Sequence, residues 1–111
     1  MAASTSAPGA DPSVAIQGLS KLLEHRSRLA TCVLLSRNDR MSFSALKRLL
    51  QETDGNLGAQ LKRLEDAGFV SVEKAYEERK PISWYTLTAA GKAALTQHLE
   101  ALRVLVDAGL G

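Results

Sequence analysis

The sequence has a single cysteine, no long apolar run and almost no net charge, and each shortage narrows what the protein can be. Among its 111 residues only Cys32 is a cysteine, so no disulfide can form within the chain, as is typical of a reducing cytoplasm. Cys32 lies in the apolar run LATCVLL and is predicted to be a small buried residue, not a nucleophile. No segment approaches the roughly 18 uninterrupted apolar residues of a membrane span. We therefore expect one cytoplasmic globular domain, and the charge of +2 neither implies nor excludes a nucleic-acid partner.

Residues that carry catalysis or bind metals are also sparse. The two histidines, His25 and His98, are far apart in sequence and are expected at the protein surface or, for His98, at an interface. No nucleophile, base and acid form a recognisable set, and no glycine-rich phosphate loop is present. A metal site would require both histidines to meet carboxylates across a dimer. The sequence therefore predicts no enzyme, no cofactor and no metal.

Hydrophobic periodicity predicts several helices and one β-hairpin. Residues 1–13 are small and polar, so we expect a disordered leader before one domain over 14–111. Helices are predicted over 14–24, 25–37, 44–51, 54–67 and 89–109. Strands are predicted over 69–76 and 82–87, joined by the turn EERKP.

Local residue chemistry supports the helix ends. Thr53 and Thr88 are expected to cap helices by accepting a free backbone N–H, and either Ser42 or Ser44 should do the same. Gly68 is the expected left-handed residue after a last turn. The helix over 44–51 should face the core with Leu46, Leu49 and Leu50.

The segment TDGNLGAQLKRLEDAGFV, residues 53–70, places two glycines in the first turns of a helix, where each costs about 1 kcal/mol relative to alanine. On a helical wheel the core side carries Leu57, Leu61 and Leu64. The opposite side carries Gly55, Ala59, Lys62 and Asp66, flanked by Asn56, Gly58 and Arg63. A side that is small at its start and basic further along suits close approach by another surface, such as the DNA major groove.

Individual side chains of this helix match base chemistry. Asn56 and Gln60 are suited to bidentate contact with adenine, and Lys62 or Arg63 to guanine or phosphate. A simpler interpretation is that the glycines only loosen the start of an ordinary charged helix. The context favours DNA, because a helix-turn-helix followed by a hairpin is the layout of a winged helix-turn-helix. In that layout Arg79 and Lys80 at the hairpin tip can reach phosphate or the minor groove.

Four segments carry a family resemblance: HRSRLATCVLL, MSFSALKRLL, TDGNLGAQLKRLEDAGFVSVEK and YTLTAAGKAAL. From His25 to Leu99 the chain resembles small winged-helix transcriptional regulators of the MarR and ArsR types. The resemblance implies an α+β, mostly α fold with a two-stranded wing and a long C-terminal dimerisation helix. It implies a homodimer on a pseudo-palindromic operator, with the helix at 54–67 in the major groove.

The candidate DNA-contacting positions are Ser44, Thr53, Asp54, Gly55, Asn56, Ala59, Gln60, Lys62, Arg63, Arg79 and Lys80. Two features depart from the family pattern. Glu77 and Glu78 open the wing tip and would repel phosphate, and Thr86 stands where many relatives carry a basic residue.

The first and last helices carry apolar stripes that are larger than one small fold can cover, which is typical of an interface. The candidate dimer residues are Ile16, Leu19, Leu22, Leu23, Leu95, Leu99, Leu102 and Val106. The alternative is a monomer whose N-terminal helix folds over the stripe of the last helix. A dimer could also hold a small effector, although the sequence identifies none.

These observations predict a cytoplasmic transcription factor that binds double-stranded DNA, with repression favoured over activation. The alternative is a winged-helix protein–protein module that does not bind DNA. The low net charge and the acidic wing tip favour the module, whereas the small side of the helix over 54–67 with its Asn, Gln and Arg residues opposes it.

Overall fold

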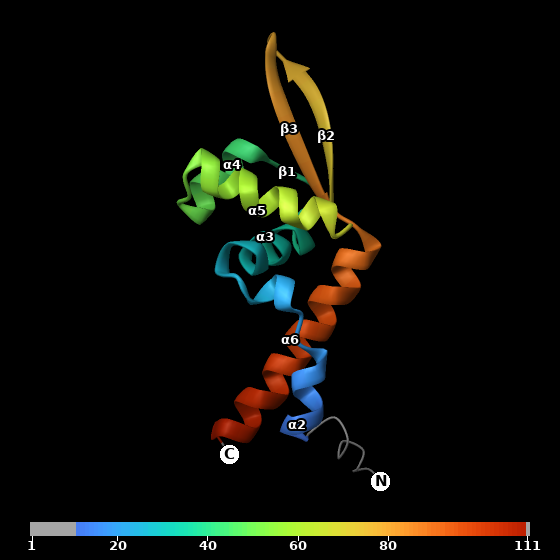
Figure 1. Cartoon of the computed structure of the whole chain (residues 1–111). Helices are drawn as coiled ribbons and strands as arrows, with labels where there is room; N and C mark the ends of the chain where they lie inside the picture. The colour runs from blue at the N-terminus through green and yellow to red at the C-terminus, as the bar shows by residue number, and fades with distance from the viewer. Residues whose placement is uncertain (1–10, 111) are drawn as a thin grey trace.

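The computed structural model describes residues 11–110, and its dimensions of 59 × 24 × 21 Å show an elongated molecule. A β-hairpin wing projects from one end, a helical core lies in the middle, and the long helix α6 extends to the other end (Figure 1). The expected leader falls outside the described residues over 1–10. Pro12 and Ser13, which the prediction included in the leader, begin the helix α2 (Pro12–Ala15).

The N-terminal segment is not the single helix predicted over 14–24. It forms the short helix α2 (Pro12–Ala15), which continues directly into the 3-10 turn η1 (Ile16–Gly18). The extended residues Leu19 and Ser20 then lead to a second 3-10 turn, η2 (Lys21–Glu24). Asp11 caps α2 by accepting the Ser13 N–H at 3.0 Å. Gly18 interrupts the helix and lies so close to α6 that a Cβ there would be 3.3 Å from the Ala101 Cβ. The break lets η2 turn away and bury Leu23 completely in the core.

Three helices form the centre of the domain, as predicted: α3 (Arg26–Ser36), α4 (Phe43–Leu50) and α5 (Asp54–Asp66). Ser42 caps α4 and Thr53 caps α5, each accepting a backbone N–H at 3.1 Å. Gly68 ends α5 with φ 80, which confirms the expected left-handed residue. Gln51, also left-handed with φ 55, makes the turn between α4 and α5.

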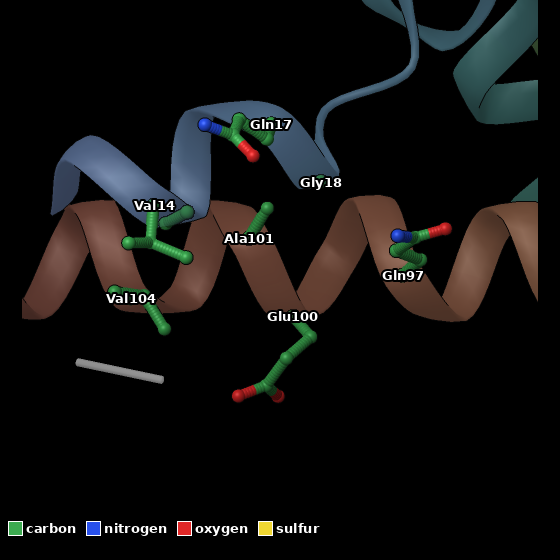
Figure 2. Close-up of a pocket in the computed structure, with 8 residues that line it drawn as sticks. Val14, Gln17, Gly18, Gln97, Glu100, Ala101 and Val104 are labelled. Carbon is green, nitrogen blue, oxygen red and sulfur yellow. The ribbon is translucent and has the colours of Figure 1, made fainter. Parts of the chain in front are cut away.

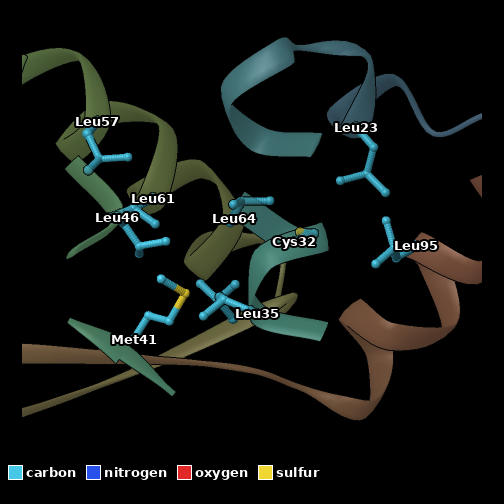
Figure 3. Packing of buried hydrophobic residues seen from close by; sticks show 10 residues of the cluster. Leu23, Cys32, Leu35, Met41, Leu46, Leu57, Leu61, Leu64 and Leu95 are labelled. Atoms are coloured by element: carbon cyan, nitrogen blue, oxygen red, sulfur yellow. The ribbon is translucent and has the colours of Figure 1, made fainter. Parts of the chain in front are cut away.

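The core lies where α3, α4, α5 and the base of the wing meet (Figure 3). Its buried members are Leu23, Cys32, Leu35, Met41, Leu46, Leu57, Leu61, Leu64, Val70 and Leu95. Cys32 is fully buried, as predicted, and burial raises the pKa of its thiol to about 11. The inward placement of Leu49 is wrong, because its side chain is 54% exposed.

The sheet has a strand that the sequence did not reveal. β1 (Met41–Ser42) pairs with β3 (Lys80–Leu87), which pairs with β2 (Val70–Glu77), all antiparallel in the order β1-β3-β2. Two residues show no periodicity, so β1 could not be found by pattern. The hairpin turn is also tighter than predicted, because only Glu78 and Arg79 form it, both with positive φ. Such a turn matches the right-handed twist of the strands.

Helix α6 (Ala89–Leu110) is tied to the rest of the domain at its first turn. The Thr88 hydroxyl caps it by accepting the Gly91 N–H at 3.0 Å and donates to the Gly68 carbonyl at 2.6 Å. The Thr88 N–H donates to the Phe69 carbonyl at 3.0 Å. Gly91 packs on the same carbonyl, so closely that an added Cβ would lie 2.2 Å from the oxygen. Within the described residues, no helix is long and apolar enough to cross a membrane.

The buried side of α6 is rotated from the predicted one. Leu95 is buried as expected, but the stripe continues through His98, Ala101 and Val104, whereas Leu99 is exposed. The buried face of α6 therefore includes the polar His98 and the small Ala101 between Leu95 and Val104, and leucine periodicity alone misplaced it.

We expect Gly91→Ala to destabilise the domain by about 1–3 kcal/mol, the usual cost of overpacking. Alanine ordinarily stabilises a helix relative to glycine, but here its methyl group meets the Phe69 carbonyl. Gly109→Ala is the matched control in the same helix, since its Cβ would meet nothing within 4 Å. Thermal unfolding followed by circular dichroism tests this, and an unchanged or higher melting temperature for Gly91→Ala would contradict it.

Candidate nucleic-acid interface

The outward side of α5 has the composition predicted from the sequence. Leu57, Leu61 and Leu64 are buried. The exposed residues of α5 include Asp54, Gly55, Asn56, Ala59, Lys62 and Arg63. A Cβ added at Gly55 or Gly58 would meet nothing within 4 Å. Packing within the described chain therefore does not require glycine at either position.

The N-terminal end of α5 lies beside α4 in a shallow hollow of about 600 Å³. Its lining includes exposed Ser44, a predicted site residue, and exposed Arg48, which the prediction missed. Lys47 forms an ion pair with Asp54 at 2.8 Å. The pair offsets the negative charge of Asp54 at a place where a phosphate would otherwise be repelled. Basic residues on α4 could have been noticed from the run LKRLL.

The wing and the start of α4 enclose a second hollow of about 530 Å³, lined by Ser44, Lys74, Tyr76 and Lys80 among others. Tyr76 is 76% exposed. Arg79 lies in the exposed turn, next to Glu78. Lys74 and Tyr76 were missed as candidates, although their alternate spacing in a predicted strand places them on one face.

The base of the wing is held by an aromatic contact. The Arg40 guanidinium lies 4.0 Å from the centre of the Trp84 ring and 4.0 Å from the Glu73 carboxylate. A cation over a tryptophan face is a favourable contact. Trp84 therefore packs against Arg40 at the base of the wing.

Gln60 does not lie where the sequence placed it. Its side chain is only 8% exposed, so Gln60 is not accessible for the predicted contact with adenine. Its Oε1 accepts a hydrogen bond from the Arg28 guanidinium on α3, and its Nε2 donates to the Asn56 Oδ1 at 3.4 Å. Gln60 was assigned to the groove by its amide chemistry, but its side chain is turned toward a long polar partner on α3.

Glu52, in the turn before α5, is a polar residue that the sequence analysis missed. Its carboxylate accepts hydrogen bonds from the Ser27 hydroxyl and from the Asn56 amide. These bonds, with smaller contributions from Arg26 and His25, lower the pKa of Glu52 below its ordinary value of 4.5. The ionised carboxylate thus joins α3 to the start of α5.

The predicted dimer residues fall into three groups by burial. Leu23 and Leu95 belong to the core, which corrects their assignment to an interface. Leu19, Leu22 and Leu102 are half-buried. The exposed members are Ile16, Leu99 and Val106, joined by Val14, which was not predicted.

His98, predicted at the surface or at an interface, lies inside the chain between α6 and the N-terminal segment. It is 2% exposed, and its Nδ1 accepts the Ser20 N–H at 2.9 Å, which fastens the N-terminal segment to α6. Figure 2 shows α2 and η1 lying along α6, with a groove of about 440 Å³ that Val14, Ala101 and Val104 help to line. This packing agrees with the alternative in which the N-terminal segment covers part of α6. Within the described residues, no three His, Cys, Asp or Glu side chains gather as a metal site would need.

A model of the winged helix DNA-binding domain family matches residues 27–106. The chain belongs to this family. The match begins in α3 and ends in α6, so the winged-helix domain includes the helix-turn-helix and the wing, while α2, η1 and η2 lie outside it. The family is one of DNA-binding domains, not of enzymes.

Known proteins with similar sequence or structure support the same fold. An uncharacterized protein of Methanocaldococcus jannaschii is 30% identical over 79 residues, which are 71% of this chain and 86% of that protein. The structure of a transcriptional regulator homologue from Pyrococcus horikoshii OT3 has a TM-score of 0.75 at 27% identity, covering 80% of this chain and 88% of that one. A MarR-family transcriptional regulator from Silicibacter pomeroyi shares the fold at 22% identity, with a TM-score of 0.61 over 89% of this chain and 62% of that one. The winged-helix domain is therefore that of a DNA-binding regulator.

Glu52→Gln should destabilise the winged-helix domain at neutral pH and much less in acid. The pKa of Glu52 is lower in the folded chain than its ordinary value of 4.5. The ionised carboxylate therefore contributes fully to the stability of the folded chain above about pH 4.5. The contribution is lost as the pH falls through the lowered value. Melting temperatures of both proteins at pH 7 and pH 3 test this. A difference that stays constant between the two pH values would show that the charge of Glu52 is not involved.

Proposed function

We propose that the protein is a sequence-specific transcriptional regulator that binds a pseudo-palindromic operator as a homodimer, with α5 in the major groove and the wing beside it. Its favoured action is repression, by blocking access to a promoter in the cytoplasm. The observation that carries the proposal is that α5 combines two glycines that packing does not require, Gly55 and Gly58, with exposed basic residues on its outward side.

The glycines support an external partner because the fold gives no reason for them. Gly55 and Gly58 each leave open space where a Cβ would be, yet each costs about 1 kcal/mol of helix stability. A duplex lying against the start of α5 supplies a reason, since side chains there would hold it away from the backbone. The N-terminal amides and positive dipole end of a helix also favour phosphate.

The surrounding charges support the same orientation. Lys62 and Arg63 are exposed on the outward side of α5, and exposed Arg48 of α4 lines the hollow at the start of α5. Lys74 and Lys80 line the hollow beside the wing. Basic residues on both sides of α5 can contact the phosphates that border the DNA groove into which α5 inserts.

The alternative is a winged-helix module that binds another protein. The acidic pair Glu77 and Glu78 near the wing tip favours it, because carboxylates there would repel phosphate. Fluorescence anisotropy on the protein's own upstream DNA and on an unrelated duplex, over a salt series, separates the two functions. Preferential binding with a steep salt dependence supports the regulator. No binding to either duplex at low salt would support the module.

Replacing Gly55 and Gly58 together by alanine should stabilise the domain and weaken specific DNA binding. Alanine adds up to about 1 kcal/mol of helix stability at each site, while the added methyl groups hold the duplex away. We expect about a tenfold loss of affinity, the size of one disturbed base contact. The measurements are thermal unfolding and anisotropy on the preferred duplex. Gly109→Ala, at the far end of α6, is the control that should leave DNA affinity unchanged; affinity that survives in the double variant would contradict the proposed role of α5.

The homodimer is proposed from the exposed apolar side chains of the terminal elements. Val14 and Ile16 are 49% and 57% exposed, and Leu99 and Val106 of α6 are 42% and 52% exposed. Val14 belongs to α2 and Ile16 to η1, and both elements pack along α6 away from the wing (Figure 1). An isologous contact there would cover them and leave both copies of α5 free.

We expect Val106→Glu and Leu99→Glu to convert a dimer into a monomer, because a buried unpaired carboxylate opposes association. Leu49→Glu is a matched control, since Leu49 is similarly exposed but lies on α4. Light scattering after size exclusion gives the mass of each protein. A wild-type chain that is monomeric at high concentration would contradict the proposed dimer.

A further inference from the structure

Five side chains form a ring of hydrogen bonds that joins α3 to the first half of α5. Ser27 and Arg28 come from α3, Glu52 from the turn, and Asn56 and Gln60 from α5. Arg28 donates to Gln60, Gln60 donates to Asn56, Asn56 donates to Glu52, and Ser27 donates to Glu52. Ser27 and Arg28 are consecutive residues, so the backbone closes the ring.

The direction of every bond in the ring is set by its two ends. Arginine can only donate hydrogen bonds, and an ionised glutamate can only accept them. The Gln60 Oε1 must therefore face Arg28, which leaves its Nε2 to donate to the Asn56 Oδ1. The Asn56 Nδ2 must in turn face Glu52. Turning over either amide would oppose two donors or two acceptors, so the orientation of the Asn56 amide is fixed by its neighbours.

The ring leaves part of Asn56 unused. An asparagine amide has two N–H donors and an oxygen with two lone pairs. Gln60 takes one lone pair and Glu52 takes one N–H, which leaves one acceptor and one adjacent donor. Asn56 is exposed on α5, whereas Gln60 and Ser27 are buried. The unused pair is what the major-groove edge of adenine requires, an acceptor for its N6 amino group and a donor to N7.

We propose that this ring presents Asn56 as an adenine-reading residue of α5, with Gln60, Glu52 and Arg28 as the residues that position it. The inference rests on the proposed function and adds to it the base that is read and the side chains that fix the reading. Arg28 also donates to the Leu22 carbonyl at 2.6 Å. The ring is thereby held to η2, and fixing the Asn56 amide in advance lowers the entropy lost on contact.

The first test uses the free protein and does not depend on DNA. In the full chain, the Asn56 side-chain N–H held by Glu52 should exchange with water more slowly than the side-chain N–H groups of exposed Gln51. Proton exchange measured by nitrogen-edited NMR gives both rates, and Glu52→Ala should remove the difference. Equal rates for Asn56 and Gln51 in the wild-type chain would overturn the ring as a positioning device.

The second test measures which base is read. The wild-type chain selects its preferred site from a library of random duplexes, and each adenine of that site is then replaced by guanine. We expect one adenine per half-site whose replacement weakens wild-type binding about 10-fold or more, the size of one bidentate contact. Gln60→Glu keeps the acceptor for Arg28 but cannot donate to Asn56. The ratio of its affinities for the adenine and the guanine duplex should therefore fall close to one. Asn56→Ala should abolish the discrimination, and Gln60→Glu should then add nothing.

Lys62→Ala is the control for a general loss of binding, since it should weaken all duplexes alike and retain the discrimination. If Gln60→Glu or Asn56→Ala retains the adenine preference while wild-type binding is specific, the inference fails and the proposed function stands. If the wild-type chain enriches no sequence at all, both fail. Melting curves establish that Gln60→Glu is folded, and Gln60→Met, which loses both bonds without adding charge, should give the same loss of discrimination.

Discussion

The joint at Gly68, Phe69, Thr88 and Gly91 is the contact on which the arrangement of the whole molecule depends. The end of α5, the start of β2 and the start of α6 meet there through the carbonyls of Gly68 and Phe69, both bonded to Thr88. Gly91 lets α6 approach that backbone more closely than any side chain would permit. A single joint thereby sets the directions of the helix proposed for the groove, the wing and the helix proposed for the dimer. A change at this point would alter the spacing between the two copies of α5 in the proposed dimer.

Helix α5 keeps its position although its own sequence is poor for a helix. Three fully buried leucines anchor one side, and the ring through Glu52, Gln60 and Arg28 anchors its flank against α3. Thr53 caps the first turn and Lys47 pairs with Asp54. Because these contacts stabilise α5, residues on its outward side do not have to contribute to folding. The proposed DNA surface can therefore be small and open without loosening the helix.

The sequence predicted the parts of the fold that depend on local chemistry. Caps and the left-handed Gly68 act within a few residues, so Thr53, Thr88 and Gly68 were predicted, and of the two candidate caps Ser42 and Ser44 the structure shows Ser42. The errors came from partners distant in sequence. Strand β1 exists only because it pairs with β3, Gln60 is drawn inward by Arg28, and the face of α6 is set by the N-terminal segment that bonds to His98. The pairing of β1 and the buried face of α6 cannot be read from a periodic pattern along one helix, whereas the spacing of Gln60 from Leu57 and Leu64 already placed it beside the buried side of α5.

The buried thiol at the centre of the core has a consequence for how the molecule can be observed. Cys32 is enclosed by apolar side chains and its pKa is raised to about 11, so at neutral pH it is almost wholly un-ionised and inert to alkylating reagents. Modification therefore has to wait until the helices separate. The rate at which a thiol reagent modifies the single cysteine therefore measures how often the core opens. Comparing this modification rate with and without duplex DNA would show how much a bound partner suppresses opening of the domain.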